Sequence, residues 1–283
     1  MKTIRTVAEL RAALAVPRRS GERIGLVPTM GAFHDGHLAL MRQARRESDV
    51  VVVSLFVNPT QFNETKDLNA YPRDEARDAE LALSAGVDYL FAPSAEEVYP
   101  PGFATKIHVS GVTELLEGAS RGPAHFDGVT TVVTKLLNMV APDTAYFGQK
   151  DAQQALVIRR LVTDLDIPVQ IEIAPTVREA DGLAMSSRNV RLSPEERDRA
   201  TALHRALVFA AGQLASGETE TAALVTEARS QLEQAGVATE YFEIVDSETL
   251  APLVRVDRPA LALVAARVGD TRLIDNQPLT QED

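Results

Sequence analysis

The sequence predicts an α/β protein, with a Rossmann-like, doubly wound parallel sheet domain followed by a smaller α+β domain at the C-terminus. Through about the first 170 residues, short apolar runs alternate with segments of helical spacing, as in strands joined by crossover helices. After residue 187 the order changes to two helical segments and then three strand-like runs. At 283 residues the chain is also long for one core. We therefore expect two domains, at residues 1–176 and 177–283.

In the N-terminal domain, prolines and apolar runs define the expected elements. Proline cannot donate to a strand ladder, so Pro28 and Pro59 should end the first two strands. The polar segment 17–22, which starts with Pro17, should end the first helix. We expect helices at 7–15, 37–47, 74–85, 128–140 and 152–164. The expected strands are 24–27, 50–57, 89–91, 144–147 and 169–173.

The C-terminal domain opens with a clear helix start. Ser193 is a good N-cap, Pro194 suits the first helical position, and Glu196 would complete a capping box. A helix should then run to about residue 215, and a second should span 221–234. The expected strands are 241–245, 260–268 and 272–275.

Composition excludes several classes of protein. The net charge of −11 argues against a nucleic-acid surface, which needs a concentrated basic footprint. The chain has no cysteine, which removes disulfides, thiolate zinc sites and a cysteine nucleophile and fits a reducing compartment. The longest apolar runs, 50–53 and 261–266, are too short to span a bilayer. We expect a cytoplasmic enzyme with no nucleic-acid or membrane partner.

The most informative segment is 28–37, which leaves the first central strand and enters a helix. A parallel α/β fold presents backbone N–H groups and a positive helix end to anions at such a corner. Gly31 and Gly36 have P-loop spacing, but His37 stands where a P-loop has lysine. His34 and His37 are three residues apart and can converge on one group, such as a triphosphate.

Two other interpretations of these histidines remain open. Either residue could be an ordinary surface or capping residue. A metal pair is less favoured, because no third ligand of suitable type lies nearby in the sequence.

The His-x-Gly-His corner resembles the signature of the nucleotidyltransferase superfamily, which includes the class I aminoacyl-tRNA synthetases. Within it, the segments 28–31 and 34–37 resemble the pantothenate synthetase family. Four further segments agree in the same order and extend the resemblance over nearly the whole chain. They are 56–62, 71–74, 148–151 with Gln153 and Gln154, and 178–188.

The resemblance implies an ATP-dependent ligase that joins pantoate to β-alanine through a pantoyl-adenylate and releases AMP and pyrophosphate. It implies Mg²⁺ with the nucleotide, a homodimer, and a C-terminal domain that acts as a lid. The implied catalytic residues are His34, His37, Lys150 and Arg188. The implied ATP-binding residues are Met30, Gly31, His34, Gly36, His37, Gly148, Gln149, Lys150, Asp151, Val177, Met185, Ser186, Ser187 and Arg188.

The side chains suit these roles. The amides of Gln61 and Gln154 both donate and accept, which matches a substrate with a carboxylate and two hydroxyls. Lys150 offers a point charge and Arg188 a planar fork for phosphate oxygens. The resemblance implies pantoate binding by Pro28, Thr29, Met30, Gln61 and Gln154, and β-alanine binding by Gln61. Asp74 and Asp151 are the candidate carboxylates near Mg²⁺.

Two departures from the family pattern and three rival functions also follow from the sequence. Gln149 stands where glutamate is common, and Ala152 stands where an aromatic residue is common. We expect these changes to alter affinity more than the reaction. The rivals are another small-molecule nucleotidyltransferase and a non-catalytic nucleotide-binding regulator. A tRNA ligase is disfavoured by the acidic charge.

Overall fold

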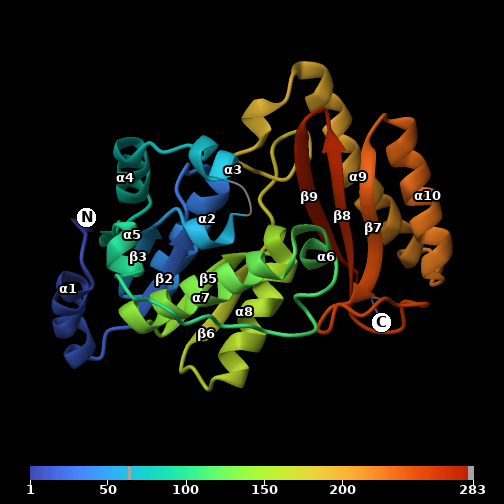
Figure 1. Ribbon diagram of the computed structural model, residues 1–283. Coiled ribbons are helices and arrows are strands. Elements are labelled where there is room, and N and C mark those ends of the chain that lie inside the picture. The colour runs from blue at the N-terminus through green and yellow to red at the C-terminus, as the bar shows by residue number, and fades with distance from the viewer. Residues whose placement is uncertain (63–64, 280–283) are drawn as a thin grey trace. The chain divides into compact units, whose positions relative to one another are not determined.

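The computed structural model describes residues 1–62 and 65–279 (Figure 1). The chain divides into two compact units. The first contains Met1–Gly148 and Gln153–Pro175, and the second contains Gln149–Ala152 and the chain from Thr176 onward. The sequence did not predict the grouping of Gln149–Ala152 with the second unit. That the units are domains divided at residues 176 and 177 stays a prediction.

The first unit is built on a six-stranded sheet in the order β1-β4-β3-β2-β5-β6, and every neighbouring pair is parallel. From β2, the strands β3 and β4 extend to one side and β5 and β6 to the other, which is doubly wound topology. The expected fold class is therefore confirmed. The strands are β1 (Lys2–Ile4), β2 (Ile24–Thr29), β3 (Val50–Leu55), β4 (Tyr89–Phe91), β5 (Thr144–Gly148) and β6 (Gln170–Ala174).

Both faces of this sheet are buried, as β3 shows. Successive side chains of a strand point to opposite faces. Val50 and Val52 lie in one apolar cluster, with residues of α1, α7 and α8, whereas Val51 and Val53 lie in another, with residues of α2 and α4. The helices of this part are α1 (Val7–Ser20), α2 (Asp35–Glu47), α3 (Thr65–Ala70), α4 (Glu75–Ser84), α5 (Ala95–Val98), α6 (Glu117–Arg121), α7 (Pro123–Val140) and α8 (Ala152–Asp164).

The predicted end of the first helix is wrong. α1 continues through Pro17 to Ser20, and Gly21 then ends it in the left-handed conformation with φ 75°. The N–H of Glu22 donates to the carbonyl of Pro17, so the helix ends in a Schellman-type cap. A glycine that adopts this conformation without strain terminates the helix more effectively than one proline near its last turn.

The second unit has two helices, α9 (Pro194–Ala215) and α10 (Thr221–Gln234), and a three-stranded antiparallel sheet in the order β7-β8-β9. The expected capping box is present, since Ser193 and Glu196 bond each other's backbone N–H. One apolar cluster joins the helices to the sheet. The strands are β7 (Ala238–Asp246), β8 (Ala260–Val268) and β9 (Thr271–Leu279). Across the described ranges, no helix is long and apolar enough to cross a membrane.

Candidate functional site

The carboxyl ends of four neighbouring strands lead into predicted substrate segments. These strands are β3, β2, β5 and β6, in that order across the sheet. The segment 30–37 follows β2, 56–62 follows β3, 148–151 begins at the end of β5, and Val177 follows β6 closely. Ligands of open α/β sheets bind at this edge, where the strand order reverses. The topology therefore brings the starts of these segments to one edge of one sheet.

The loop after β2 has an unusual backbone held by a buried carboxylate. Gly31 has φ 89° and Ala32 has φ 53°, and a Cβ on Gly31 would lie 2.9 Å from Asp78 Oδ2. Asp78 accepts hydrogen bonds from the N–H groups of Ala32 (2.9 Å) and Phe33 (2.8 Å), and it is only 1% exposed. Asp78 is not among the residues predicted from the sequence. Its spacing from Ala82, one helical turn away on the buried side of α4, was the available signal.

His34 and His37 lie together at the start of α2, with ring centroids 4.1 Å apart. His34 Nδ1 accepts from the N–H of Gly36 (3.2 Å), and His37 Nδ1 accepts from the N–H of His34 (3.4 Å). The capping interpretation is therefore correct for the Nδ1 atoms. A neutral imidazole that accepts at Nδ1 carries its proton at Nε2. Acceptance at Nδ1 favours, in each neutral ring, the tautomer with its proton on Nε2.

Gln61 lies in a short 3₁₀ helix, Pro59–Gln61, after β3. The buried Asn58 donates to Gln61 Oε1 (3.1 Å), which directs the Gln61 Nε2 donors away from Asn58. The helix α7 packs directly on this turn, because a Cβ on Gly128 would lie 2.5 Å from the carbonyl oxygen of Thr60. Asn58 also donates to the carbonyl of Gly128 (3.1 Å), so one side chain links the amide of Gln61 to α7.

Other predicted residues of the first unit have local structural partners. Thr29 Oγ1 donates to the carbonyl of Ser54 on β3 (2.5 Å). Gln153 is buried and bonds the backbone of 112–117, whereas its neighbour Gln154 is partly exposed in the first turn of α8. A Cβ on Gly148 would meet nothing within 4 Å, so space is open beside its backbone.

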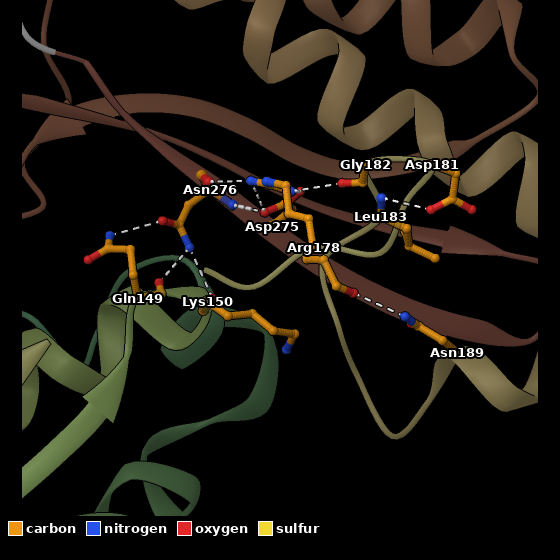
Figure 2. A network of polar contacts seen from close by, with 10 residues as sticks. Gln149, Lys150, Arg178, Asp181, Gly182, Leu183, Asn189, Asp275 and Asn276 are labelled. Atoms are coloured by element: carbon orange, nitrogen blue, oxygen red, sulfur yellow. Dashed lines mark hydrogen bonds and ion pairs between the residues drawn. The ribbon is translucent and has the colours of Figure 1, made fainter. Parts of the chain in front are cut away.

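In the second unit, Gln149–Asp151 forms one 3₁₀ turn that is bonded to β9 (Figure 2). Asn276, which is not among the residues predicted from the sequence, makes these bonds. Lys150 Nζ lies 3.6 Å from Asp151 Oδ1, and the Lys150 side chain is mostly buried. The turn therefore fixes the backbone of Lys150 while its charged end stays beside a carboxylate.

The segment 177–185 is a small hairpin that turns at Asp181 and Gly182. Met185 N–H donates to the carbonyl of Val177 (3.0 Å), and Arg178 pairs with Ala184 as an antiparallel bridge. Gly182 has φ 91°, and a Cβ there would lie 2.6 Å from the His204 ring. Only glycine fits this turn without strain.

The chain then enters the predicted phosphate-binding residues. Ser186 Oγ accepts from the N–H of Arg188 (3.2 Å), so this hydroxyl shapes a turn. Asn189 is buried and donates to Glu179 Oε1 (2.7 Å) and to the carbonyl of Ala184 (3.0 Å). The hairpin and the turn are therefore one hydrogen-bonded piece.

A cavity of the second unit brings three predicted residues together. Lys150, Ser186 and Arg188 line it, and Arg272 of β9 lines it with them. Arg272 is paired with Glu240 (2.8 Å). Lys150, Arg188 and Arg272 therefore line one small cavity together with the carboxylate of Asp275.

The two candidate metal ligands have other partners. Asp74 caps α4 by accepting from the N–H of Arg77 (3.1 Å), and Asp151 lies beside Lys150. Within residues 1–62 and 65–279, no group of three or more His, Asp or Glu side chains could hold a metal ion. The half-exposed carboxylate of Asp151 is of a type that contacts waters of a nucleotide-bound Mg²⁺, since that ion keeps several waters and needs few protein ligands.

Comparison with known proteins gives one consistent result. The pantoate-beta-alanine ligase family model matches residues 2–278. The pantothenate synthetase of Moorella thermoacetica is 54% identical over 285 residues, covering all of both chains. The crystal structure of pantothenate synthetase from Thermus thermophilus aligns with TM-score 0.90 and 51% identity, over 98% of this chain and 99% of that one.

A third relative was solved with ligands. The pantoate-beta-alanine ligase of Francisella tularensis, complexed with beta-gamma ATP and beta-alanine, aligns with TM-score 0.81 and 33% identity, over 98% of this chain and 97% of that one. The matched sequence and fold each extend over nearly the full length of this chain. The chain belongs to the pantoate-beta-alanine ligase family.

Proposed function

We propose that this chain condenses (R)-pantoate with β-alanine to give pantothenate, consuming ATP and releasing AMP and pyrophosphate. The observation that carries the proposal is the family match over residues 2–278. The paired imidazoles at the start of α2 support it, because they lie where an α/β fold binds phosphates.

In the first half-reaction, a carboxylate oxygen of pantoate attacks the α-phosphorus of ATP. The bond from the α-phosphorus to the bridging oxygen breaks, and pyrophosphate leaves. We assign His34 and His37 to donate from Nε2 to phosphate oxygens that gain charge, and Lys150 and Arg188 to bind the triphosphate. Ser186 and Ser187, with the backbone around Gly148 and Val177, complete the proposed nucleotide contacts. No side-chain nucleophile is required.

In the second half-reaction, the neutral amine of β-alanine attacks the acyl carbon of the pantoyl-adenylate. The bond to AMP breaks, and the amine loses a proton as the amide forms. Gln61 is the proposed contact to both acid substrates, with Gln154 on pantoate. The orientation of the Gln61 amide, fixed by Asn58, supports donation to a substrate carboxylate.

A Mg²⁺ ion bound to ATP would neutralise phosphate charge and polarise the α-phosphorus. We propose Asp151, and more distantly Asp74, as the carboxylates that bind its waters. The residues of the chain do the remaining work, which is to orient the triphosphate and the pantoate carboxylate for in-line attack.

The first experiment is pantoate-dependent exchange of labelled pyrophosphate into ATP, followed by a chase with β-alanine. Exchange that requires pantoate, and an amide product on the chase, would establish both half-reactions. A rival nucleotidyltransferase would retain the nucleotide in its product. A non-catalytic regulator would bind ATP without pyrophosphate exchange. A product that retains the nucleotide, or ATP binding without exchange, would remove the proposal.

The His37→Ala variant tests the role of the imidazole. We expect pyrophosphate exchange to fall by about 10²–10³-fold, the usual loss when one such donor is removed, with an unchanged circular dichroism spectrum. His108→Ala is the matched control, because His108 is half-exposed and paired with Asp127 (2.8 Å), outside the proposed site. Near-normal exchange in His37→Ala would remove His37 from the mechanism.

Two further properties stay predictions from the family resemblance. We propose a homodimer, which light scattering after size-exclusion chromatography would test. We propose a cytoplasmic location, which cell fractionation would test. A monomer or a membrane-associated fraction would contradict them.

A further inference from the structure

Asn276 makes three hydrogen bonds to two residues that lie over 120 positions earlier in the chain. Its Nδ2 donates to the carbonyls of Gln149 (2.8 Å) and Lys150 (3.0 Å), and its Oδ1 accepts from Gln149 Nε2 (2.9 Å). Figure 2 shows the amide of Asn276 between β9 and this turn. The residue is 2% exposed. Two accepting carbonyls on one side fix which end of the amide is nitrogen.

The geometry of these bonds restricts Lys150 in particular. The carbonyl of Gln149 belongs to the peptide plane before the Lys150 Cα, and the carbonyl of Lys150 belongs to the plane after it. Because each peptide is planar, holding both planes fixes the two soft dihedrals of Lys150. The direction of its Cα–Cβ bond follows. Asn276 thus restrains the point from which the flexible side chain of Lys150 extends, through hydrogen bonds to the backbone.

The next residue of β9 holds the other predicted phosphate segment. Asp275 forms a bidentate ion pair with Arg178, at 2.6 and 3.1 Å, and Arg178 also donates to the carbonyl of Gly182 (3.1 Å). Asp275 Oδ1 accepts from the N–H of Asn276 (2.8 Å), so the two supports are joined. Consecutive residues of one strand therefore hold the Lys150 turn and the hairpin that leads to Ser186 and Arg188.

We propose that Asn276 is a positioning residue for adenylate formation, acting by directing Lys150 into the cavity that Ser186 and Arg188 also line. The inference rests on the proposed function and on the role of Lys150 within it. It concerns the first half-reaction, in which the triphosphate is held. The expected loss is therefore in kcat for pyrophosphate exchange more than in the KM for pantoate.

Two variants test the positioning. Asn276→Ala removes all three bonds, and Asn276→Asp keeps the shape and the bond from Gln149 but places an acceptor against both carbonyls. We expect both to lower exchange by about ten- to hundredfold, the size of effect that a misplacement near 1 Å produces. The matched control is Gln277→Ala, the neighbouring amide on β9, which should retain wild-type exchange.

A double-mutant cycle separates positioning from general damage. Lys150→Ala alone should lower exchange strongly. If Asn276 acts through Lys150, adding Asn276→Ala to Lys150→Ala should lower pyrophosphate exchange by less than about a further threefold. An equal loss in both backgrounds would overturn the inference, as would wild-type exchange in folded Asn276→Ala and Asn276→Asp.

Failure of the proposed function has a different signature. If the wild type shows no pantoate-dependent exchange, the substrate assignment fails first and the inference falls with it. If the wild type exchanges but Lys150→Ala matches it, only the role of Lys150 and the inference built on it are removed. Circular dichroism of each variant identifies any that does not fold. If Asn276→Ala does not fold, Asn276→Asp is the variant that tests the inference.

Discussion

The candidate residues of the two units are held in place in different ways. The loop 30–37 depends on its own backbone, with two positive φ angles, on caps made by its own histidines, and on one carboxylate 45 residues away. The segments 149–151 and 177–189 depend on side chains of β9 and α9, including Asn276 and Asp275. The loop 30–37 therefore depends on few side chains from elsewhere in the chain, Asp78 among them. A site held by distant side chains can be lost through residues that touch no substrate.

Asp275→Ala should give the largest effect on stability. It leaves the mostly buried Arg178 without its carboxylate, and breaking a buried pair from one side costs about 3–5 kcal/mol. We expect faster hydrogen exchange throughout the second unit and little change around β2. Asp164→Ala, which removes an exposed pair with Arg160, should cost at most about 1 kcal/mol. Equal rates of hydrogen exchange in the second unit of both variants would contradict its dependence on the pair of Asp275 with Arg178.

Asp78→Asn should have an intermediate effect on stability, through the loop 30–37 of the first unit. The amide keeps one acceptor but turns an NH₂ group toward a backbone donor of the loop, which leaves a buried group unsatisfied at about 1–3 kcal/mol. Urea unfolding should show the loss, and pyrophosphate exchange should fall because the imidazole pair follows this loop. Glu80→Gln, on the exposed side of the same helix, is the control. If Asp78→Asn keeps full pyrophosphate exchange, the loop 30–37 needs no carboxylate at this position.

His204→Gln should give the smallest effect, visible only in its pH dependence. Burial lowers the pKa of His204, the charge of Arg178 lowers it further, and Asp275 opposes them. The folded protein then binds fewer protons than the unfolded chain below the ordinary value near 6.5, so stability falls as the pH drops through it. The wild type should lose stability from about pH 7 to pH 5 more steeply than the variant. If urea unfolding gives the same pH dependence of the free energy of unfolding for the wild type and for His204→Gln, this prediction is contradicted.

The sequence predicted what is encoded locally. Alternating strand and helix periods indicated the doubly wound sheet, and the spacing of His34 and His37 indicated a corner where two rings meet. Ser193 and Glu196 form the capping box that their spacing indicated. In each case the residues that make the structure lie within one or two turns of one another.

What the sequence did not predict depends on long-range partners. Asp78 and Asn276 have no sequence pattern that marks them, and Asn58 is only one position of the matched segment 56–62. The backbone groups that these three bind lie 45 to 127 positions away, and only the fold brings them near. The end of α1 differs from the prediction for a local reason, because Gly21 caps the helix and Pro17 does not end it. The roles of the site residues in catalysis stay predictions.

The grouping of Gln149–Ala152 with the second unit has a consequence for how the protein can be divided or recombined. A fragment that starts at Thr176 would carry Asn276 without the turn that it holds. A hybrid gene that exchanged only this C-terminal segment between divergent relatives would place the amide of Asn276 beside a turn that comes from another protein. Such a hybrid loses the side-chain bond to Asn276 wherever its residue 149 is not glutamine, although about 125 residues separate the two positions in the chain.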